Sequence, residues 1–114
     1  MQPESRKYLY DIRAAAERIA TFTKGRDVQG FAKDELLRSG VERQFEIIGE
    51  ALAQLARRDP GLAERISEHA RIIAFRNILI HGYAEVDPRI VWDIVTSKLP
   101  TLRAEVERLT SEPD

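Results

Sequence analysis

Apolar side chains recur every three or four residues in four segments of the chain, the spacing that places them on one face of an α-helix. These segments cover roughly residues 5–23, 34–58, 70–82 and 87–109. Residues 62–67 add a short turn of helix, and no window alternates as a half-buried strand does. The pattern predicts an all-α, up-and-down four-helix bundle with a short extra helix, in a single domain over residues 1–114.

Three of the four segments carry one clear apolar stripe, which we assign to the core. The stripe positions are Leu9, Ile12, Ala16, Ile19 and Phe22; Val41, Phe45, Ile48, Leu52 and Leu55; and Val91, Ile94, Val95, Leu99, Leu102, Val106 and Leu109.

Glycine and proline mark the ends of these segments. Gly25 is a natural C-cap for the first helix, and Pro60 stops the second. Residues 27–32 are expected to be a connector. Asp87-Pro88 has the form of an N-cap followed by proline at the first helical position. Pro100 falls inside the last apolar pattern, so that helix should kink or split in two.

The third segment differs from the others because apolar residues surround nearly the whole helix, up to His81-Gly82-Tyr83. Such a helix is expected to be buried, either inside the bundle or in a dimer interface. Arg76 falls in the middle of its main stripe and needs a carboxylate partner or an anionic ligand. Glu42, Glu46 and Glu50 repeat every four residues on the second helix and are candidate partners, Glu46 and Glu50 above all. A purely structural ion pair explains Arg76 equally well at this point.

Asn77 and His81 are four residues apart and share a second face of the same helix with two alanines. Small residues there allow another helix, or a second copy of this one, to approach closely. A histidine at a helix end can simply be a C-terminal cap. Gly82 can end the helix in a left-handed conformation and expose Tyr83, which can equally be a core aromatic.

Charge and composition restrict the possible partners. The chain has 18 basic and 19 acidic residues, so it lacks the basic excess of proteins that coat DNA, although a small cationic site remains possible. It contains no cysteine, and we find neither a signal peptide nor a membrane span, which favours a cytoplasmic protein. Two histidines twelve residues apart make no recognisable metal site, and we expect no metal and no cofactor.

The combination Arg-Asn-x3-His-Gly-Tyr at the end of an apolar helix resembles the Arg-polar-x3-His motif of the HEPN superfamily, in the Arg-x4-His-x-Tyr form of HepT-like toxins. Gly49-Glu50-Ala51, after Ile47-Ile48, is also similar to the HepT-like pattern. The resemblance extends from the opening at Tyr8 to the helix that contains Trp92.

This resemblance implies a HEPN-like fold and a metal-independent endoribonuclease that acts as a homodimer. It further implies the toxin of a type II or type VII toxin–antitoxin system. The implied partner is a nucleotidyltransferase antitoxin of the MntA type, which silences the toxin by adding AMP to Tyr83.

The residues suit this chemistry in their own right. RNA carries its own nucleophile, the ribose 2′-hydroxyl, so cleavage needs a proton carrier active near neutral pH, such as a histidine, here His81. A guanidinium such as that of Arg76 stabilises the charged phosphorane, and Asn77 can orient either group. Because one chain supplies a single motif histidine, a twofold dimer would bring the second.

Two other functions fit the same residues. The chain could be a non-catalytic helical module that binds a nucleotide or substrate for a nucleotidyltransferase, with Arg76 and His81 gripping the ligand. It could also be a structural homodimer whose motif is an internal ion-pair network.

Overall fold

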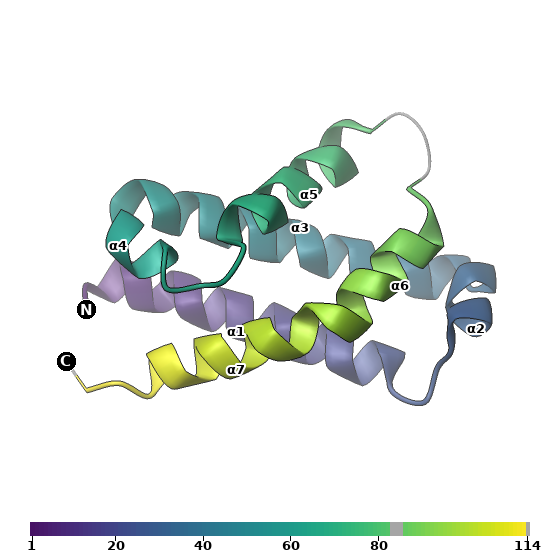
Figure 1. The fold of residues 1–114 in the computed structure, drawn as a ribbon, viewed down its shortest axis with the longest axis horizontal. Helices are drawn as coiled ribbons and strands as arrows, with labels where there is room; N and C mark the ends of the chain where they lie inside the picture. Colours follow the sequence, from purple (N-terminus) through teal and green to yellow (C-terminus); the bar gives the residue numbers. More distant parts are fainter. Residues whose placement is uncertain (83–85, 114) are drawn as a thin grey trace.

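The computed structural model of the chain describes residues 1–82 and 86–113. Within these residues the chain forms seven α-helices and no strand (Figure 1). The expected all-α helical bundle is confirmed. The helices are α1 (Pro3–Thr23), α2 (Val28–Lys33), α3 (Glu35–Arg58), α4 (Pro60–Ala63), α5 (His69–His81), α6 (Pro88–Ser97) and α7 (Leu99–Thr110).

Aspartate side chains begin several of these helices. The carboxylate of Asp34 accepts a hydrogen bond from the backbone N–H of Leu37 at the start of α3, and Asp27 does the same for Gly30 in α2. Each bond satisfies a backbone donor that the first turn of a helix leaves free. At the other end of α1, Gly25 has a φ of 74°, the left-handed conformation expected of a glycine after a helix.

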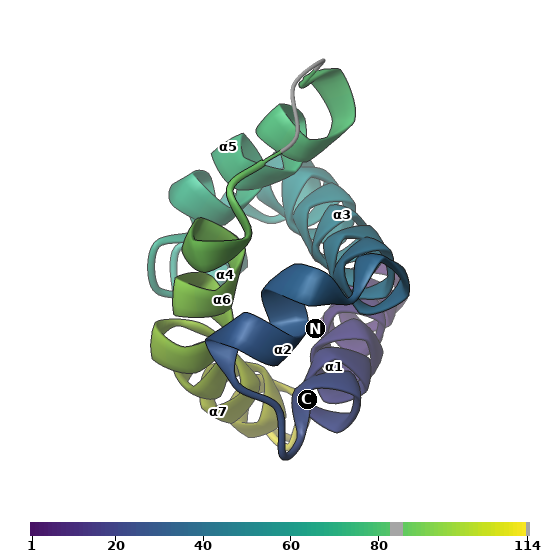
Figure 2. The ribbon, with the colours of Figure 1, turned by 90° about the vertical axis from the view of Figure 1, so that its right-hand side faces the viewer.

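Two long helices form the frame of the bundle. α1 and α3 run side by side in opposite directions, and α7 lies along α1 (Figure 1). α5 crosses α3 on the side away from α7, and α2 crosses one end of the bundle (Figure 2). The last expected helix is split in two: α6 ends at Ser97, and Pro100 lies in the first turn of α7, where its missing N–H removes no helical hydrogen bond.

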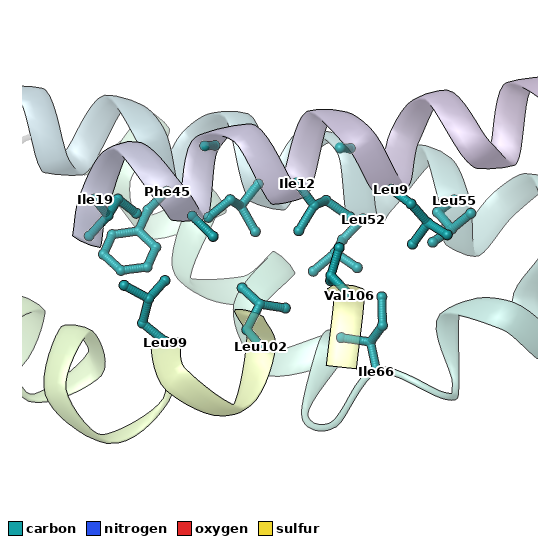
Figure 3. Close-up of a cluster of buried hydrophobic side chains, with 14 of the residues drawn as sticks. Leu9, Ile12, Ile19, Phe45, Leu52, Leu55, Ile66, Leu99, Leu102 and Val106 are labelled. Carbon is teal, nitrogen blue, oxygen red and sulfur yellow. The ribbon is translucent and has the colours of Figure 1, made fainter. Parts of the chain in front are cut away.

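Most of the core lies between α1, α3 and α7 and comes from the predicted stripes (Figure 3). Phe31, Leu62 and Ile66, which are outside these stripes, are buried with them. Leu9, Ile12 and Ile19 of α1 are fully buried against α3 and α7. Among the α1 stripe positions, Phe22 is the exception, since it lies at the end of the helix and is 39% exposed. No helix among the described residues is long and apolar enough to cross a membrane.

The expectation of a connector over residues 27–32 is wrong. α2 begins at Val28 and ends at Lys33, and it buries Phe31 completely. The Phe31 ring packs against Trp92 of α6 with ring centroids 5.3 Å apart. A six-residue helix is too short to be stable alone, so this tertiary contact, which the local pattern does not contain, holds it.

Replacing a core leucine of α3 should cost far more than replacing an exposed one. Leu52 is fully buried, whereas Leu36 on the same helix is 84% exposed. We expect Leu52→Ala to lower the free energy of unfolding by about 2–5 kcal/mol, because it removes apolar contacts and leaves a cavity. Leu36→Ala, the matched control, should change it by less than about 0.5 kcal/mol. Urea unfolding at one protein concentration measures both, and equal costs would contradict the assignment of the core.

Candidate functional site

The motif residues lie on α5, whose first residue is preceded by an unusual turn. Glu68 has a φ of 57° and a ψ of 29°, a left-handed conformation that costs a non-glycine residue on the order of 1–2 kcal/mol. Its carboxylate lies 2.9 Å from the ammonium of Lys98, between α6 and α7, and 3.2 Å from the guanidinium of Arg71. The hydrogen bond from Lys98 lowers the pKa of Glu68. These contacts tie the start of α5 to the α6–α7 junction.

The rest of α5 lies on α3, not inside the bundle. Ile72, Ile73, Phe75 and Leu79 are half-buried and pack against the core. The Phe75 ring meets Phe45 of α3 edge to face, with ring centroids 5.5 Å apart.

Of the two expectations for this helix, burial inside the bundle is wrong, and burial in a dimer interface stays a prediction. α5 contains no buried residue, and Ile78 and Ile80 are 56% and 46% exposed. The helix is apolar nearly all round, yet among the described residues it is the side facing α3 that is covered. Its remaining apolar surface is therefore open to an interaction outside the chain.

Arg76 lies on the covered side of α5. Its side chain is 14% exposed, and its Nη2 atom lies 3.2 Å from the Glu50 carboxylate of α3. Glu50 is one of the two carboxylates expected to support it; the other, Glu46, forms an ion pair with Arg43 on its own helix. The Arg76 Nε is buried and finds no hydrogen-bond partner among the described residues. The guanidinium is thus held at one end by a carboxylate that itself remains 54% exposed.

Asn77 and His81 lie on the opposite, exposed side of α5, together with Ala70 and Ala74. Arg76 and His81 are five residues apart, which separates them by about 140° around the helix. A single chain therefore does not bring these two side chains to one face.

The helix ends at His81, and the backbone turns at Gly82. Gly82 has a φ of −72° and a ψ of 123°, so its backbone is extended and the expected left-handed conformation is wrong. The Gly82 N–H donates to the carbonyl of Ile78 at 2.8 Å and closes the last turn. Tyr83, the expected modification site, lies outside the described residues.

Two hollows flank α5. One, of about 280 Å³, lies between α5, α6 and α7 and is lined by Phe75, Ile94 and Lys98 among others; Arg76, Asn77 and His81 are not part of its lining. The other, of about 420 Å³, lies between α1, α3 and α5 and includes Glu50 and Ile80. The second hollow is therefore the one next to the Arg76–Glu50 pair.

The chemistry available on α5 is that of a cation and a proton carrier. The described residues contain no group of three or more histidine, cysteine, aspartate or glutamate side chains that could hold a metal ion. A guanidinium stabilises developing negative charge, and an imidazole transfers protons near neutral pH.

One residue that contributes to this geometry was visible in the sequence only as part of a resemblance. Gly49 is buried in the middle of α3, directly under Arg76. A glycine in the interior of an otherwise regular helix weakens it, and that is the signal by which such a residue can be found from sequence.

Known proteins resemble this chain over nearly its whole length. A protein of Thermococcus cleftensis named "Probable ribonuclease HepT" is 35% identical over 111 residues, which cover 96% of this chain and 98% of that protein. A protein of Methanocaldococcus jannaschii named as a putative RNase is 34% identical over 102 residues, 88% of this chain and 91% of its own length. A protein of Caldanaerobacter subterraneus subsp. tengcongensis, also named as a putative RNase, is 31% identical over 109 residues, 91% of this chain and 92% of its own. No solved structure matches the chain significantly.

A protein-family model described as "Ribonuclease HepT-like" matches residues 12–109, from the middle of α1 to the last turn of α7. The matched range includes the Arg76–Glu50 pair, Asn77 and His81. The resemblance expected from the motif is confirmed by this match and by the three relatives. The chain belongs to the HepT-like ribonuclease family.

Proposed function

We propose that this HepT-like ribonuclease is a metal-independent endoribonuclease toxin that cleaves RNA at a composite site in a homodimer. The observation that carries the proposal is the position of Arg76, a cation that is 14% exposed and paired with the Glu50 carboxylate, on a largely apolar helix and five residues before His81. The family assignment supplies the substrate class, because ribonucleases act on RNA.

Cleavage proceeds by attack of the ribose 2′-hydroxyl on the neighbouring phosphorus. A base removes the hydroxyl proton, a new bond forms between the 2′-oxygen and phosphorus, and an acid protonates the departing 5′-oxygen. The products are a 2′,3′-cyclic phosphate and a 5′-hydroxyl. His81 is the proton carrier, Arg76 stabilises the negative charge on the phosphorane, and Asn77 orients the imidazole or the phosphate.

Dimerisation would place in one cleft the catalytic groups that a single chain keeps apart. His81 and Arg76 point to different sides of α5, and a single chain offers one motif histidine although the reaction needs a base and an acid. A second copy packed on the exposed side of α5 would cover Ile78 and Ile80. The exposed alanines at positions 70 and 74 allow two copies of the helix to approach closely. A twofold axis there would set two copies of His81 around one cleft.

Regulation follows from the tyrosine after the helix. We propose that a nucleotidyltransferase antitoxin of the MntA type transfers AMP from ATP to Tyr83. The phenolic oxygen forms a bond to the α-phosphorus of ATP, pyrophosphate leaves, and the phenolic proton is released. The attached phosphate then brings negative charge two residues from His81, where it pairs with Arg76 and repels RNA.

RNA cleavage should persist in EDTA and leave 2′,3′-cyclic phosphate ends. His81→Ala and Arg76→Ala should each lower the rate by roughly 10²-fold or more, because each removes a group that acts in the transition state. His69→Ala, a change of the other histidine on the same helix, is the matched control and should keep the native rate. Cleavage that disappears with chelator and returns with magnesium contradicts the mechanism. Binding of RNA without cleavage favours the non-catalytic binding module.

Sedimentation at micromolar concentration should give twice the 13.0 kDa mass of the chain. Ile78→Glu places a charge on the exposed apolar side of α5, so it should shift the protein to monomer and lower RNA cleavage in parallel. Leu36→Glu, at an exposed leucine in the first turn of α3, should leave the dimer intact. A native chain that sediments as a monomer while it cleaves RNA excludes the composite site.

Incubation with the antitoxin and ATP should add one or more AMP units to the peptide that contains Tyr83, as measured by mass spectrometry. Tyr83→Phe lacks the phenolic oxygen, so it should stay unmodified and remain active in the presence of the antitoxin. Tyr10→Phe is the control, since Tyr10 is 48% exposed on α1 and should not affect modification. If the antitoxin fully silences Tyr83→Phe, inhibition works by occlusion of the site.

A further inference from the structure

Gly49 occupies a position where a helix would ordinarily carry a side chain. It lies in the middle of the 24-residue helix α3 and is buried. Glycine weakens a helix interior because it gains the most backbone freedom on unfolding. α3 has a second interior glycine, Gly40, which is half-buried and provides a direct comparison.

The space above Gly49 is filled by Arg76. A Cβ atom on Gly49 would lie 2.7 Å from the Cγ of Arg76 and closer still to its Cβ, with the Ile72 carbonyl oxygen 3.5 Å away. Carbon atoms in van der Waals contact are about 3.5–4.0 Å apart. The nearer of the two obstructing atoms, the Cβ of Arg76, moves only with the backbone of α5. By contrast, a Cβ on Gly40 would meet only the Phe22 ring, at 3.7 Å, an ordinary contact.

The close approach decides where the guanidinium lies. The stem of Arg76 rests on the Gly49 backbone, and its Nη2 meets Glu50, the next residue of α3. The Arg76 Nε is buried without a hydrogen-bond partner among the described residues, so no second polar contact at that atom fixes the head. The position of the charge therefore depends on how closely the stem packs on α3.

We infer that Gly49 is a positioning residue for Arg76: the missing side chain lets α5 close on α3 and sets the guanidinium where the RNA phosphate is to bind. The inference rests on the proposed function, in which Arg76 stabilises the phosphorane. An added methyl group at Gly49 pushes α5 outward by about 1 Å, and a displacement of that size at a catalytic group costs up to about 10²-fold in rate.

The test compares Gly49→Ala with Gly40→Ala, the same substitution in the same helix. Under single-turnover conditions with EDTA, Gly49→Ala should lower the maximal cleavage rate roughly 10- to 100-fold while the half-saturating RNA concentration changes by less than about 3-fold. Gly40→Ala should keep the native rate. Gly49→Ala at the native rate, alongside an inactive Arg76→Ala, overturns the inference and leaves the proposed function standing.

A double-mutant cycle separates positioning from a general loss of structure. If Gly49 acts through Arg76, adding Gly49→Ala to Arg76→Ala should lower the residual rate by less than about 2-fold. A merely structural role would lower the rate by a similar factor in both backgrounds, and that result overturns the inference.

Two further measurements test the role of Gly49 without the RNA-cleavage assay. If the native chain does not cleave RNA, the proposed function fails, and proton exchange at the Arg76 Nε by NMR still tests the geometry. Slow exchange in the native chain that becomes fast in Gly49→Ala supports it; unchanged exchange overturns it.

If Gly49→Ala does not fold, it is combined with Arg76→Gly, which removes both obstructing carbons. Folding of that pair supports the contact, and failure to fold overturns it.

Discussion

The packing of α3 on two sides is the constraint on which the rest of the molecule depends. On one side Ile48, Leu52 and Leu55 are fully buried in the core shared with α1 and α7. On the adjoining side Gly49, together with the core residue Phe45, receives α5. Burial of the first set supplies the hydrophobic stabilisation that holds the long helices, and this fixes the rotation of α3 about its own axis. Once that rotation is fixed, it also determines which residues of α3 face α5.

The exposed apolar surface of α5 is a consequence of this arrangement. Within the part of the chain that the structure describes, this largely apolar helix is covered on one side. Ile78 and Ile80 are therefore exposed to solvent, which is unfavourable for apolar side chains. Apolar surface that a fold leaves uncovered often marks a site of interaction with another molecule. The same helix carries Arg76 and His81, to which the proposed function assigns the chemistry, and its exposed side is where that function places the second copy of the chain.

The Arg76–Glu50 pair shows how a guanidinium can be ion-paired within the protein and still be available to a phosphate. Burial of a guanidinium stem strengthens its electrostatic interactions, because less water surrounds it. Glu50 is more than half exposed, so solvent screens its hold on the arginine. A phosphate that approaches past the exposed Glu50 side chain can therefore compete for the guanidinium, since its two non-bridging oxygens offer the same two-pronged geometry and the same single negative charge as a carboxylate. A phosphate would break a fully buried ion pair less readily, because breaking it leaves an unpaired buried charge.

The sequence by itself determined the long helices, most of the core and the family. Period, caps and proline positions are local properties, so α1, α3, the split between α6 and α7, and residues such as Leu52 could be predicted from them. Tertiary structure alone decided that residues 28–33 are a helix, because Phe31 needs Trp92 to hold it. It also decided that Arg76 meets Glu50 and that α5 stays open on one side. These outcomes depend on how closely and at what angle two helices cross, and that depends on residues far apart in the chain, such as Gly49 and Arg76.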